Sequence, residues 1–339
     1  MSLLFWTFTI GRFWNLTSES SLVSIHRHYQ PSNQVILSMS TGIKGIHFRN
    51  LMYLQAKHFN VHQYMLTITN LKSSCVDLIG DCAYSSQYMS RDARFIIQRL
   101  RARVYWMYML YRTGLDVFQL DSDIVWFANP LRISAEFPMY GIIGAEDGLP
   151  FNGGFVYARH VSNCSDSIIE WLLYSWSRRL IEWGGDEQST LIDIMSSMIT
   201  HVPYSTEQEL IMRGKSSVIP IREKRVNLVR KLAKSIKGEN SYIISPFENN
   251  FSYPVHGLFN QTVPYIASNC KSTLALGIVK RFTYNLRLCK NNIVTMLHLS
   301  GFPIKSLRPS IVQLYRGLIR NESGDAIDEF RKFVCSSNK

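Results

Sequence analysis

The sequence contains six cysteines but no two of them are separated by only two residues. The absence of a Cys-x-x-Cys pair argues against a zinc ribbon and against a thioredoxin-like redox site. Cys75 with Cys82, and Cys270 with Cys289, are close enough in sequence to close short disulfide loops in an oxidising compartment. The alternative is that all six are buried thiols, which behave as small apolar side chains.

No apolar run approaches the roughly 20 residues that a membrane-spanning helix needs. The first apolar segment, Leu3 to Ile10, is much shorter, and it lacks the basic start and the small-residue cleavage site of a signal peptide. Two interpretations stay open. The segment is either the end of a truncated signal anchor, which would bring the chain to a membrane, or it packs on the folded domain.

Acidic residues are scarce relative to basic ones. The 339 residues include 37 Lys and Arg but 25 Asp and Glu, for a formal net charge of +12. This excess favours an anionic partner such as a nucleic acid, a membrane surface, or a phosphorylated or acidic-sugar substrate. Residues 204–240 are rich in Lys and Arg, without the interleaved aromatics that stack nucleobases. We therefore expect no nucleic-acid partner, and interpret this stretch as a solvated surface, or as a surface for an anionic acceptor or lipid headgroups.

Hydrophobic residues make up 46% of the chain and aromatic residues 12%, enough for a large core in one large or two modest domains. Residues 34–41 and 64–69 have strand patterns, and the apolar residues of 42–60 recur at helical spacing. Strand, helix and strand in this order predict a right-handed parallel crossover. A further helix is expected over residues 95–111, before Gly114.

These elements predict an α/β fold in three parts. Residues 11–33 are polar, and residues 1–33 are expected to form a stem or irregular lead-in. Residues 34–200 would form the core, within which residues 70–91 would be a cysteine-bearing loop. Residues 201–339 would form a C-terminal part that includes the basic stretch.

Two acids stand at the end of a predicted buried strand. The run Val117 to Leu120 is apolar with one polar interruption, as is typical of a strand inside a parallel sheet. A buried, unpaired carboxylate is costly, so the strand must end at Asp121 and Asp123, at the edge where α/β sheets bind ligands. Two carboxylates there suit Mg²⁺ or Mn²⁺, with substrate phosphates as further ligands. The simpler alternative is that they cap a turn or the next helix, since Asp-x-Asp is frequent by chance.

Two later segments place polar residues or glycines beside predicted strands. The strand expected over residues 140–145 is followed by Asp147. Asn152, Gly153 and Gly154 precede another predicted strand, and the glycines would let backbone amides approach a ligand closely.

Two further positions come from a helix start and a strand end. A helix is predicted to begin at Asp186, Glu187 and Gln188, with Asp186 placed as the N-cap. Much later, a strand is predicted to end at His298, a third candidate ligand for a divalent ion, although a single histidine is more often structural. Lys305 follows it.

The segment from Gly114 to Pro130, GLDVFQLDSDIVWFANP, resembles the core of the nucleotide-diphospho-sugar transferase family. These are GT-A glycosyltransferases, among them plant arabinosyl- and xylosyltransferases, in which a strand-borne Asp-x-Asp precedes an aromatic-rich strand and Asn/Asp-Pro-Leu. Similar elements occur in the expected order from about Ile36 to Lys305. The resemblance implies a single Rossmann-like, mostly parallel sheet flanked by helices, with a C-terminal extension on the acceptor side.

The resemblance also implies an activity: metal-dependent transfer of a sugar from a nucleoside-diphosphate sugar, with a UDP-sugar favoured, to a hydroxyl of a glycan or glycoprotein, with retention of configuration. Asp121 and Asp123, joined by His298, would hold Mn²⁺ or Mg²⁺ on the diphosphate. Lys305 comes one residue late for the family's His-x-x-Gly-x-x-Lys ending, in which the lysine contacts the diphosphate.

Further candidates follow from the same resemblance. Arg103 matches a basic residue that approaches the sugar nucleotide, and Gly153 stands where the family's donor-binding Asn-Ser/Thr-Gly element has a hydroxyl residue. Either Asp186 or Glu187 fills the acid position of the family's Asp-Gln helix start; Asp186 is favoured because Glu187 lies one residue around the helix. The candidate catalytic residues are thus Asn152, Asp186 and Gln188, and the candidate substrate-binding residues are Arg103, Asp147, Gly153, Gly154, Glu187 and Lys305.

Two other functions stay open. Leu120 to Val125 also fits the Asp-x-Asp-x-Thr/Val signature of haloacid-dehalogenase-like phosphatases, but two predicted strands precede it where that signature follows the first. A degenerate, non-catalytic transferase fold that binds glycan is the other alternative. Five Asn-x-Ser/Thr sequons favour a secretory lumen, by resemblance the Golgi.

Overall fold

The computed structural model describes most of the first 200 residues and shorter segments after them. The described residues are 10–16, 19–40, 42–85, 95–132, 135, 138, 140–145, 152–183, 187–200, 227, 240–244, 274–279, 282–283, 296–299, 304–320 and 323–336. The predicted segment Leu3 to Ile10, the basic stretch 204–240 and the pair Cys270 and Cys289 lie almost entirely outside them.

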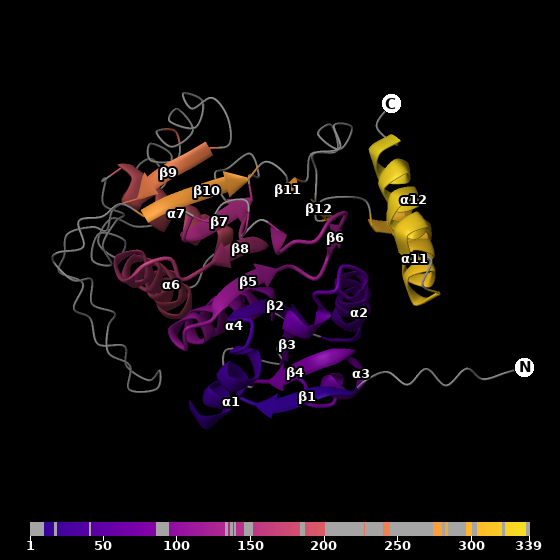
Figure 1. Ribbon diagram of the computed structural model, residues 1–339, viewed down its shortest axis with the longest axis horizontal. Coiled ribbons are helices and arrows are strands. Elements are labelled where there is room, and N and C mark those ends of the chain that lie inside the picture. The colour runs from indigo at the N-terminus through magenta and orange to yellow at the C-terminus, as the bar shows by residue number, and fades with distance from the viewer. Residues whose placement is uncertain are drawn as a thin grey trace, which may run out of the picture.

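The described residues form a mixed sheet of nine strands in the order β1-β4-β3-β2-β5-β8-β7-β10-β9 (Figure 1). Neighbours from β1 to β5 are parallel, as are β7 and β10, whereas β8 is antiparallel to both β5 and β7, and β9 is antiparallel to β10. The strands are β1 (Ile10–Asn15), β2 (Gln34–Ser40), β3 (Met65–Thr69), β4 (Gly80–Tyr84), β5 (Asp116–Leu120), β7 (Ile142–Ala145), β8 (Phe155–Ala158), β9 (Asn240–Ile244) and β10 (Leu274–Val279).

Helices cover both faces of this sheet. One face packs against α1 (Glu19–Tyr29), α4 (Phe95–Arg112), α6 (Asn163–Trp183) and α7 (Glu187–Thr200), and the other against α2 (Gly42–His58). Alternate residues of β2 show the division, since Leu37 belongs to the cluster of α4 and Ile36 to the cluster of α2. The predicted α/β class, with a mostly parallel sheet flanked by helices, is therefore confirmed.

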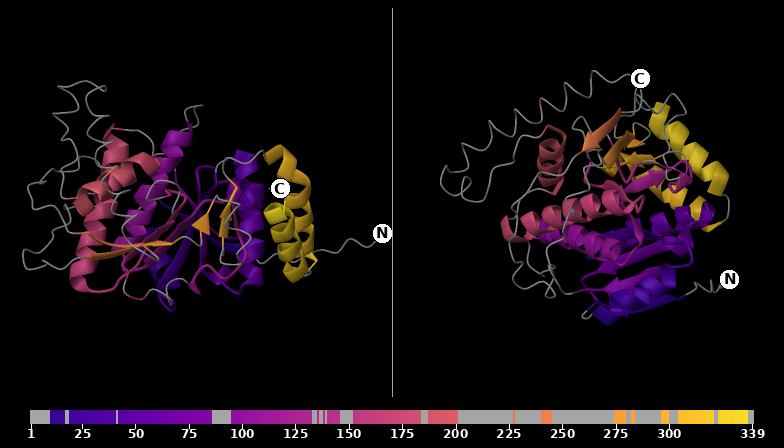
Figure 2. Two further views of the ribbon diagram at one scale, coloured as in Figure 1. Left: turned by 90° about the horizontal axis from the view of Figure 1, so that it is seen from above. Right: turned by 60° about the vertical axis from the view of Figure 1, so that its left-hand side comes forward.

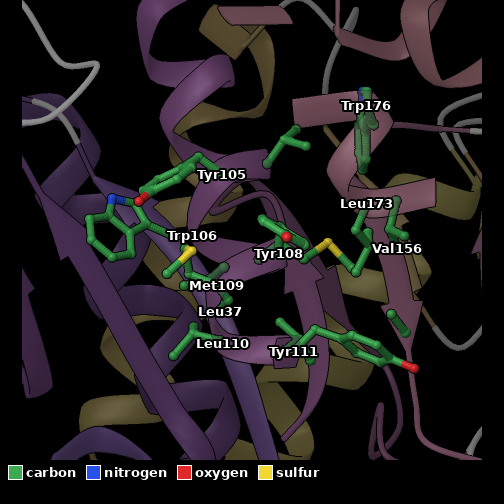
Figure 3. Packing of buried hydrophobic residues seen from close by; sticks show 14 of the residues in the cluster. Leu37, Tyr105, Trp106, Tyr108, Met109, Leu110, Tyr111, Val156, Leu173 and Trp176 are labelled. Atoms are coloured by element: carbon green, nitrogen blue, oxygen red, sulfur yellow. The ribbon is translucent and has the colours of Figure 1, made fainter. Parts of the chain in front are cut away.

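Helix α4 lies at the centre of the larger core. Its consecutive residues Tyr105, Trp106, Met107 and Tyr108 are all buried, so this part of the helix is enclosed on every side. Figure 3 shows Tyr105, Trp106 and Tyr108 in the same cluster as Leu37 and Val156 of the sheet and Leu173 and Trp176 of α6. A polar side chain in this part of the helix must therefore find its partners on the elements that pack against α4.

A second, small sheet lies beside the α2 face. It contains β11 (Phe282–Thr283), β12 (Met296–His298) and β6 (Ile124–Trp126), in that order. The hairpin of α11 (Ile304–Ile319) and α12 (Ser323–Ser336) packs on α2 and on this sheet, as Figures 1 and 2 show. Among the described residues, no helix has both the length and the apolar character needed to cross a membrane.

The strand order creates one topological switch point. The chain passes from β2 through α2 to β3 on one side of β2, while β5 pairs with β2 on its other side. At such a point the connections diverge and leave a crevice outside the carboxyl ends of the two strands, where α/β proteins bind ligands. Here those ends are Ser40 and Leu120, the latter directly before Asp121.

Two regions differ from the sequence-based expectation. Within the expected lead-in of residues 1–33, residues 10–15 form β1, which pairs with β4, and α1 packs on the sheet. The expected loop over residues 70–91 contains the short helix α3 (Ser74–Asp77) and the strand β4. Both regions are polar enough to resemble loops, but β3 provides an open parallel edge on which β4, and then β1, can form hydrogen bonds.

Cys75 and Cys82 form a disulfide, which confirms one of the two expected pairings. The bond joins α3 to the second strand from the sheet's edge, across a turn in which Gly80 has a φ of 89°. A φ in this region strains residues with a Cβ, and the ring of Tyr53 lies against the same glycine. The disulfide thus holds a short turn closed, and a glycine lets the chain adopt this conformation without strain.

At the amino end of β5, His160 connects three elements. Its Nδ1 lies 3.2 Å from Asp166 Oδ2 and its Nε2 lies 3.2 Å from the Tyr111 carbonyl oxygen. Both ring nitrogens therefore face acceptors, which favours the doubly protonated ring. Burial disfavours the charged ring, but Asp166, the charge of Asp116 and the Tyr111 carbonyl outweigh it, and the pKa of His160 is raised.

The first prediction concerns the disulfide. The double substitution Cys75→Ala and Cys82→Ala should lower the free energy of unfolding by about 2–3 kcal/mol, because the unfolded chain regains the freedom of a short loop. Urea unfolding of the oxidised protein and of the variant measures this difference. The variant should also be insensitive to dithiothreitol at the concentration that destabilises the wild type; equal stability of the two oxidised proteins would contradict the prediction.

The second prediction concerns pH. A raised pKa means that the contribution of His160 to stability is complete below its ordinary value of 6.5 and is lost as the pH rises through the folded value. Asp116, whose pKa is raised by burial, acts in the same direction but at lower pH, above 3.8. The wild type should therefore lose stability as the pH rises above 6.5, and His160→Gln should flatten that loss. His58→Gln, on a different helix, is the control, and an unchanged slope in His160→Gln would refute the assignment.

Candidate active site

Asp121 is the first residue after β5, and strand alternation decides which way it points. Val117 and Gln119 face the α4 side of the sheet, and Asp121 continues the same alternation. The Asp121 amide donates to the Gly154 carbonyl at 2.8 Å, extending the β5–β8 pairing by one residue. A Cβ on Gly154 would overlap the Asp121 carboxylate. A glycine is required at this position because the carboxylate lies directly on its Cα.

The residues before β8 form a tightly hydrogen-bonded turn. Asn152 is buried, and its Oδ1 accepts from the Gly154 amide at 2.6 Å. The Gly153 amide donates to Gln188 Oε1 at 3.3 Å, and the Gly153 carbonyl accepts from Gln119 Nε2 at 2.8 Å. Both glycine amides are thus engaged by side chains of the protein, which differs from the expectation that they face a ligand.

Arg103 lies at the centre of this arrangement. Its guanidinium pairs with Asp121 Oδ1 and with Glu187 Oε1, and Nη2 donates to the Gly153 carbonyl at 3.1 Å. The residue is only 4% exposed and Glu187 only 2%, so the Arg103–Glu187 pair is desolvated. Arg103 therefore fixes the carboxylates of two other elements, and we interpret it as a positioning residue rather than as a free donor-binding cation.

The start of α7 supplies Glu187 and Gln188. The Glu187 carbonyl accepts from Trp176 Nε1 of α6 at 3.1 Å, which anchors the first turn. The side chain of Glu187 reaches Arg103, so Glu187 occupies an acid position of the candidate site. Asp186, which the sequence favoured for that position, lies outside the described residues.

Asp123 begins the second part of the site. Its carbonyl oxygen accepts from the Leu299 amide at 3.0 Å, and β12 pairs with β6 so that His298 is opposite Ile124. The backbone of His298 is thus next to the loop that carries Asp123. On the opposite side, the Trp126 amide donates to Gln55 Oε1 of α2 at 2.7 Å.

The donor chemistry at this edge suits a hard divalent cation. Asp121 and Asp123 offer carboxylate oxygens, and Asp121 is partly accessible, with 27% of its side chain exposed. Within the described part of the chain no three His, Cys, Asp or Glu side chains are gathered closely enough to hold a metal ion. The two acids would need further ligands, from the His298 side chain or from substrate phosphates, as Mg²⁺ sites commonly do.

The structure therefore brings together most of the predicted site residues. Arg103, Asp121, Asn152, Gly153, Gly154, Glu187 and Gln188 form one connected network of hydrogen bonds and ion pairs. Asp147 and Asp186 lie outside the described residues. His298 is placed by its backbone and Lys305 lies in the first turn of α11, while the side chains of both fall outside the described part.

Two participants were missed by the sequence reasoning. Gln119 donates to the Gly153 carbonyl, and its signal was visible as the single polar interruption of the predicted strand. Gln55, fully buried on α2, holds the backbone of β6. It lacks an equivalent signal, because a glutamine within an amphipathic helix is ordinarily solvated.

Comparison with known proteins gives little. No protein-family model and no curated protein matches the chain. Among solved structures, the apo crystal structure of mouse Xyloside xylosyltransferase 1 is similar, with 10% sequence identity over 49% of this chain and 81% of that chain, and a TM-score of 0.30. At so low a TM-score the similarity carries no weight for function.

The third prediction concerns the Arg103–Glu187 pair. Arg103→Met should destabilise the protein by about 3–5 kcal/mol, because it leaves the Glu187 carboxylate buried without its counter-charge. Adding Glu187→Gln should restore much of that loss, since the amide carries no charge. The free energies of unfolding of the wild type, both single variants and the double variant give the coupling energy; additive single effects would show that the two side chains do not interact.

Proposed function

We propose that the protein is a metal-dependent glycosyltransferase that moves a sugar from a nucleoside-diphosphate sugar to a hydroxyl of a glycan or glycoprotein. One observation carries the proposal. Asp121 leaves β5 at the switch point of the sheet, where α/β folds bind ligands, and there it meets the Asn152 turn and the start of α7. The resemblance of the sequence to GT-A transferases adds support, because it implicates the same three segments.

In this proposal Asp121, Asp123 and His298 would hold Mn²⁺ or Mg²⁺, and the chemistry that the bound ion supplies is neutralisation of charge on the departing nucleoside diphosphate. The two acids come from the same strand end, so their backbone positions are fixed by Gly154 and Leu299.

The remaining residues would bind and orient the sugar. Gln188 and Asn152 are held beside the acids by the turn, and Asp186 directly precedes α7; their polar groups would fix the sugar ring for attack by an acceptor hydroxyl. Arg103 would keep Asp121 and Glu187 in place. By resemblance, Asp147, Gly153 and Lys305 would contact the donor, a UDP-sugar is favoured, and the configuration would be retained.

We further propose that the protein works in the lumen of the secretory pathway, with the Golgi favoured. The disulfide between Cys75 and Cys82 supports an oxidising compartment, since such bonds are rare in the cytosol. The basic stretch 204–240 would serve an anionic or glycan acceptor.

A non-catalytic, glycan-binding role is the second candidate. It is favoured by the engagement of the Asp121 carboxylate with Arg103, which already supplies that acid with a cation. Binding of a nucleotide sugar separates the two candidates, since a degenerate fold would bind neither the donor nor the metal.

The fourth prediction tests the activity. Wild-type protein should release nucleoside diphosphate from one member of a panel of UDP- and GDP-sugars, with Mn²⁺ and not without it. Asp121→Ala with Asp123→Ala should lower that rate by about 10³-fold or more, as expected when charge stabilisation of several kcal/mol is lost.

The control is Asp328→Ala, an exposed acid on α12 that should leave the rate unchanged. Melting temperatures of all three proteins establish that they are folded. Unchanged turnover in the double variant refutes the site, hydrolysis of an aryl phosphate instead would indicate a phosphatase, and binding of glycan without donor or metal would indicate the second candidate.

A further inference from the structure

A buried arginine outside the candidate site has no partner for its charge. Arg49 of α2 is 0% exposed, and none of its three guanidinium nitrogens has a hydrogen-bond partner in the part of the chain that the structure describes. Guanidinium groups carry five donor hydrogens and are almost always paired when buried. An unpaired buried charge is among the costliest features that a fold can contain.

The position of Arg49 follows from its neighbours on α2. Gly45, Arg49 and Tyr53 are spaced four residues apart and share one face of the helix. A Cβ on Gly45 would lie 3.0 Å from Ser40 Oγ at the end of β2, and the Tyr53 ring touches Gly80 at the start of β4. Arg49 therefore lies over the β2–β3–β4 part of the sheet, between these two contacts.

The sheet beneath Arg49 is polar. Ser38 and Ser40 share the α2 face with Ile36, and Thr67 is the register partner of Ser38. All three are buried, and their hydroxyl oxygens lack a hydrogen-bond partner in the described structure. One level lower on the same face, Ile36 and Met65 pack against α2 as an ordinary apolar layer. The unpaired hydroxyls therefore lie at the level of the Ser38–Thr67 pair and at the next level of β2, where Ser40 stands.

The nearest acid does not satisfy the guanidinium. Asp81 contributes only a charge at a distance, because its Oδ1 accepts from the Arg12 amide and its Oδ2 accepts from Tyr29 Oη and faces His28 Nε2. Burial lowers the pKa of Arg49 to about 10, which still leaves the side chain charged at neutral pH. The group facing Arg49 from Tyr53 is an aromatic ring, 6.0 Å away, which offers weak attraction.

We propose that Arg49, together with the hydroxyls of Ser38 and Thr67, binds a small inorganic anion of the halide class between α2 and the sheet. The chemistry is complementary: every group at this level can donate a hydrogen bond, and a monovalent anion supplies the missing charge. A neutral water molecule would accept from the same donors but would leave the charge in place. Arg49 is fully buried, so the site is closed to solvent. A sugar phosphate or another large anion would be too big for it.

The test compares thermal unfolding in sodium chloride, sodium bromide and sodium gluconate at equal ionic strength. The melting temperature of the wild type should rise with chloride or bromide and saturate, as expected for a ligand bound by the native state alone, and gluconate should give no such rise. Ser38→Ala should shift the half-saturating chloride concentration upwards severalfold. Arg27→Met, which removes an exposed arginine of α1, should leave the chloride response intact, whereas Arg49→Met should abolish it.

Because Arg49→Met could fail to fold, crystals of the wild type grown in bromide supply a second measurement. An anomalous peak within hydrogen-bond distance of the Arg49 guanidinium supports the site. A melting temperature independent of halide, or electron density for water alone beside Arg49, overturns it. Neither measurement depends on transferase activity, so the anion site and the proposed function can fail independently.

Discussion

One guanidinium connects four elements of this fold. Arg103 projects from α4, whose residues 102–111 are all buried, and meets carboxylates from the end of β5 and the start of α7 as well as the turn before β8. Because a buried cation must be compensated, the positions of those elements are not independent. The geometry of the candidate site is consequently set by packing in the core. The partly exposed Asp121 carboxylate is held in place by a buried residue, Arg103.

The parts of the fold with strong hydrophobic periodicity could be predicted from the sequence. The β2–α2–β3 crossover, α4 and β5 all appear within a residue or two of their expected bounds. The edge of the sheet could not. β4 reads Gly-Asp-Cys-Ala-Tyr and β1 lies in a polar stretch, so neither alternates clearly, and each exists because a neighbouring strand offers parallel hydrogen bonds.

The candidate site divides in the same way. Asp121 was predictable, because a carboxylate that ends a buried run must stand at the edge of the sheet. The partners of Arg103 were not, since they depend on which face of α4 meets β8 and α7. For the same reason the sequence, which favoured Asp186, could not show that Glu187 is the partner of that arginine. One step along a helix changes the direction of a side chain by about 100°, and only the packing of α7 fixes that direction.

The pairing of β6 with β12 has a consequence for how the protein is made. The loop that carries Asp123 is held by Leu299, a residue that leaves the ribosome long after β5 and its neighbours have been synthesised. The parallel core can form first, with local crossovers, whereas the acid loop acquires its final shape only by a contact of high sequence separation. A nascent or shortened chain would thus contain a folded parallel core with an incomplete site, and the site would be the last part to form.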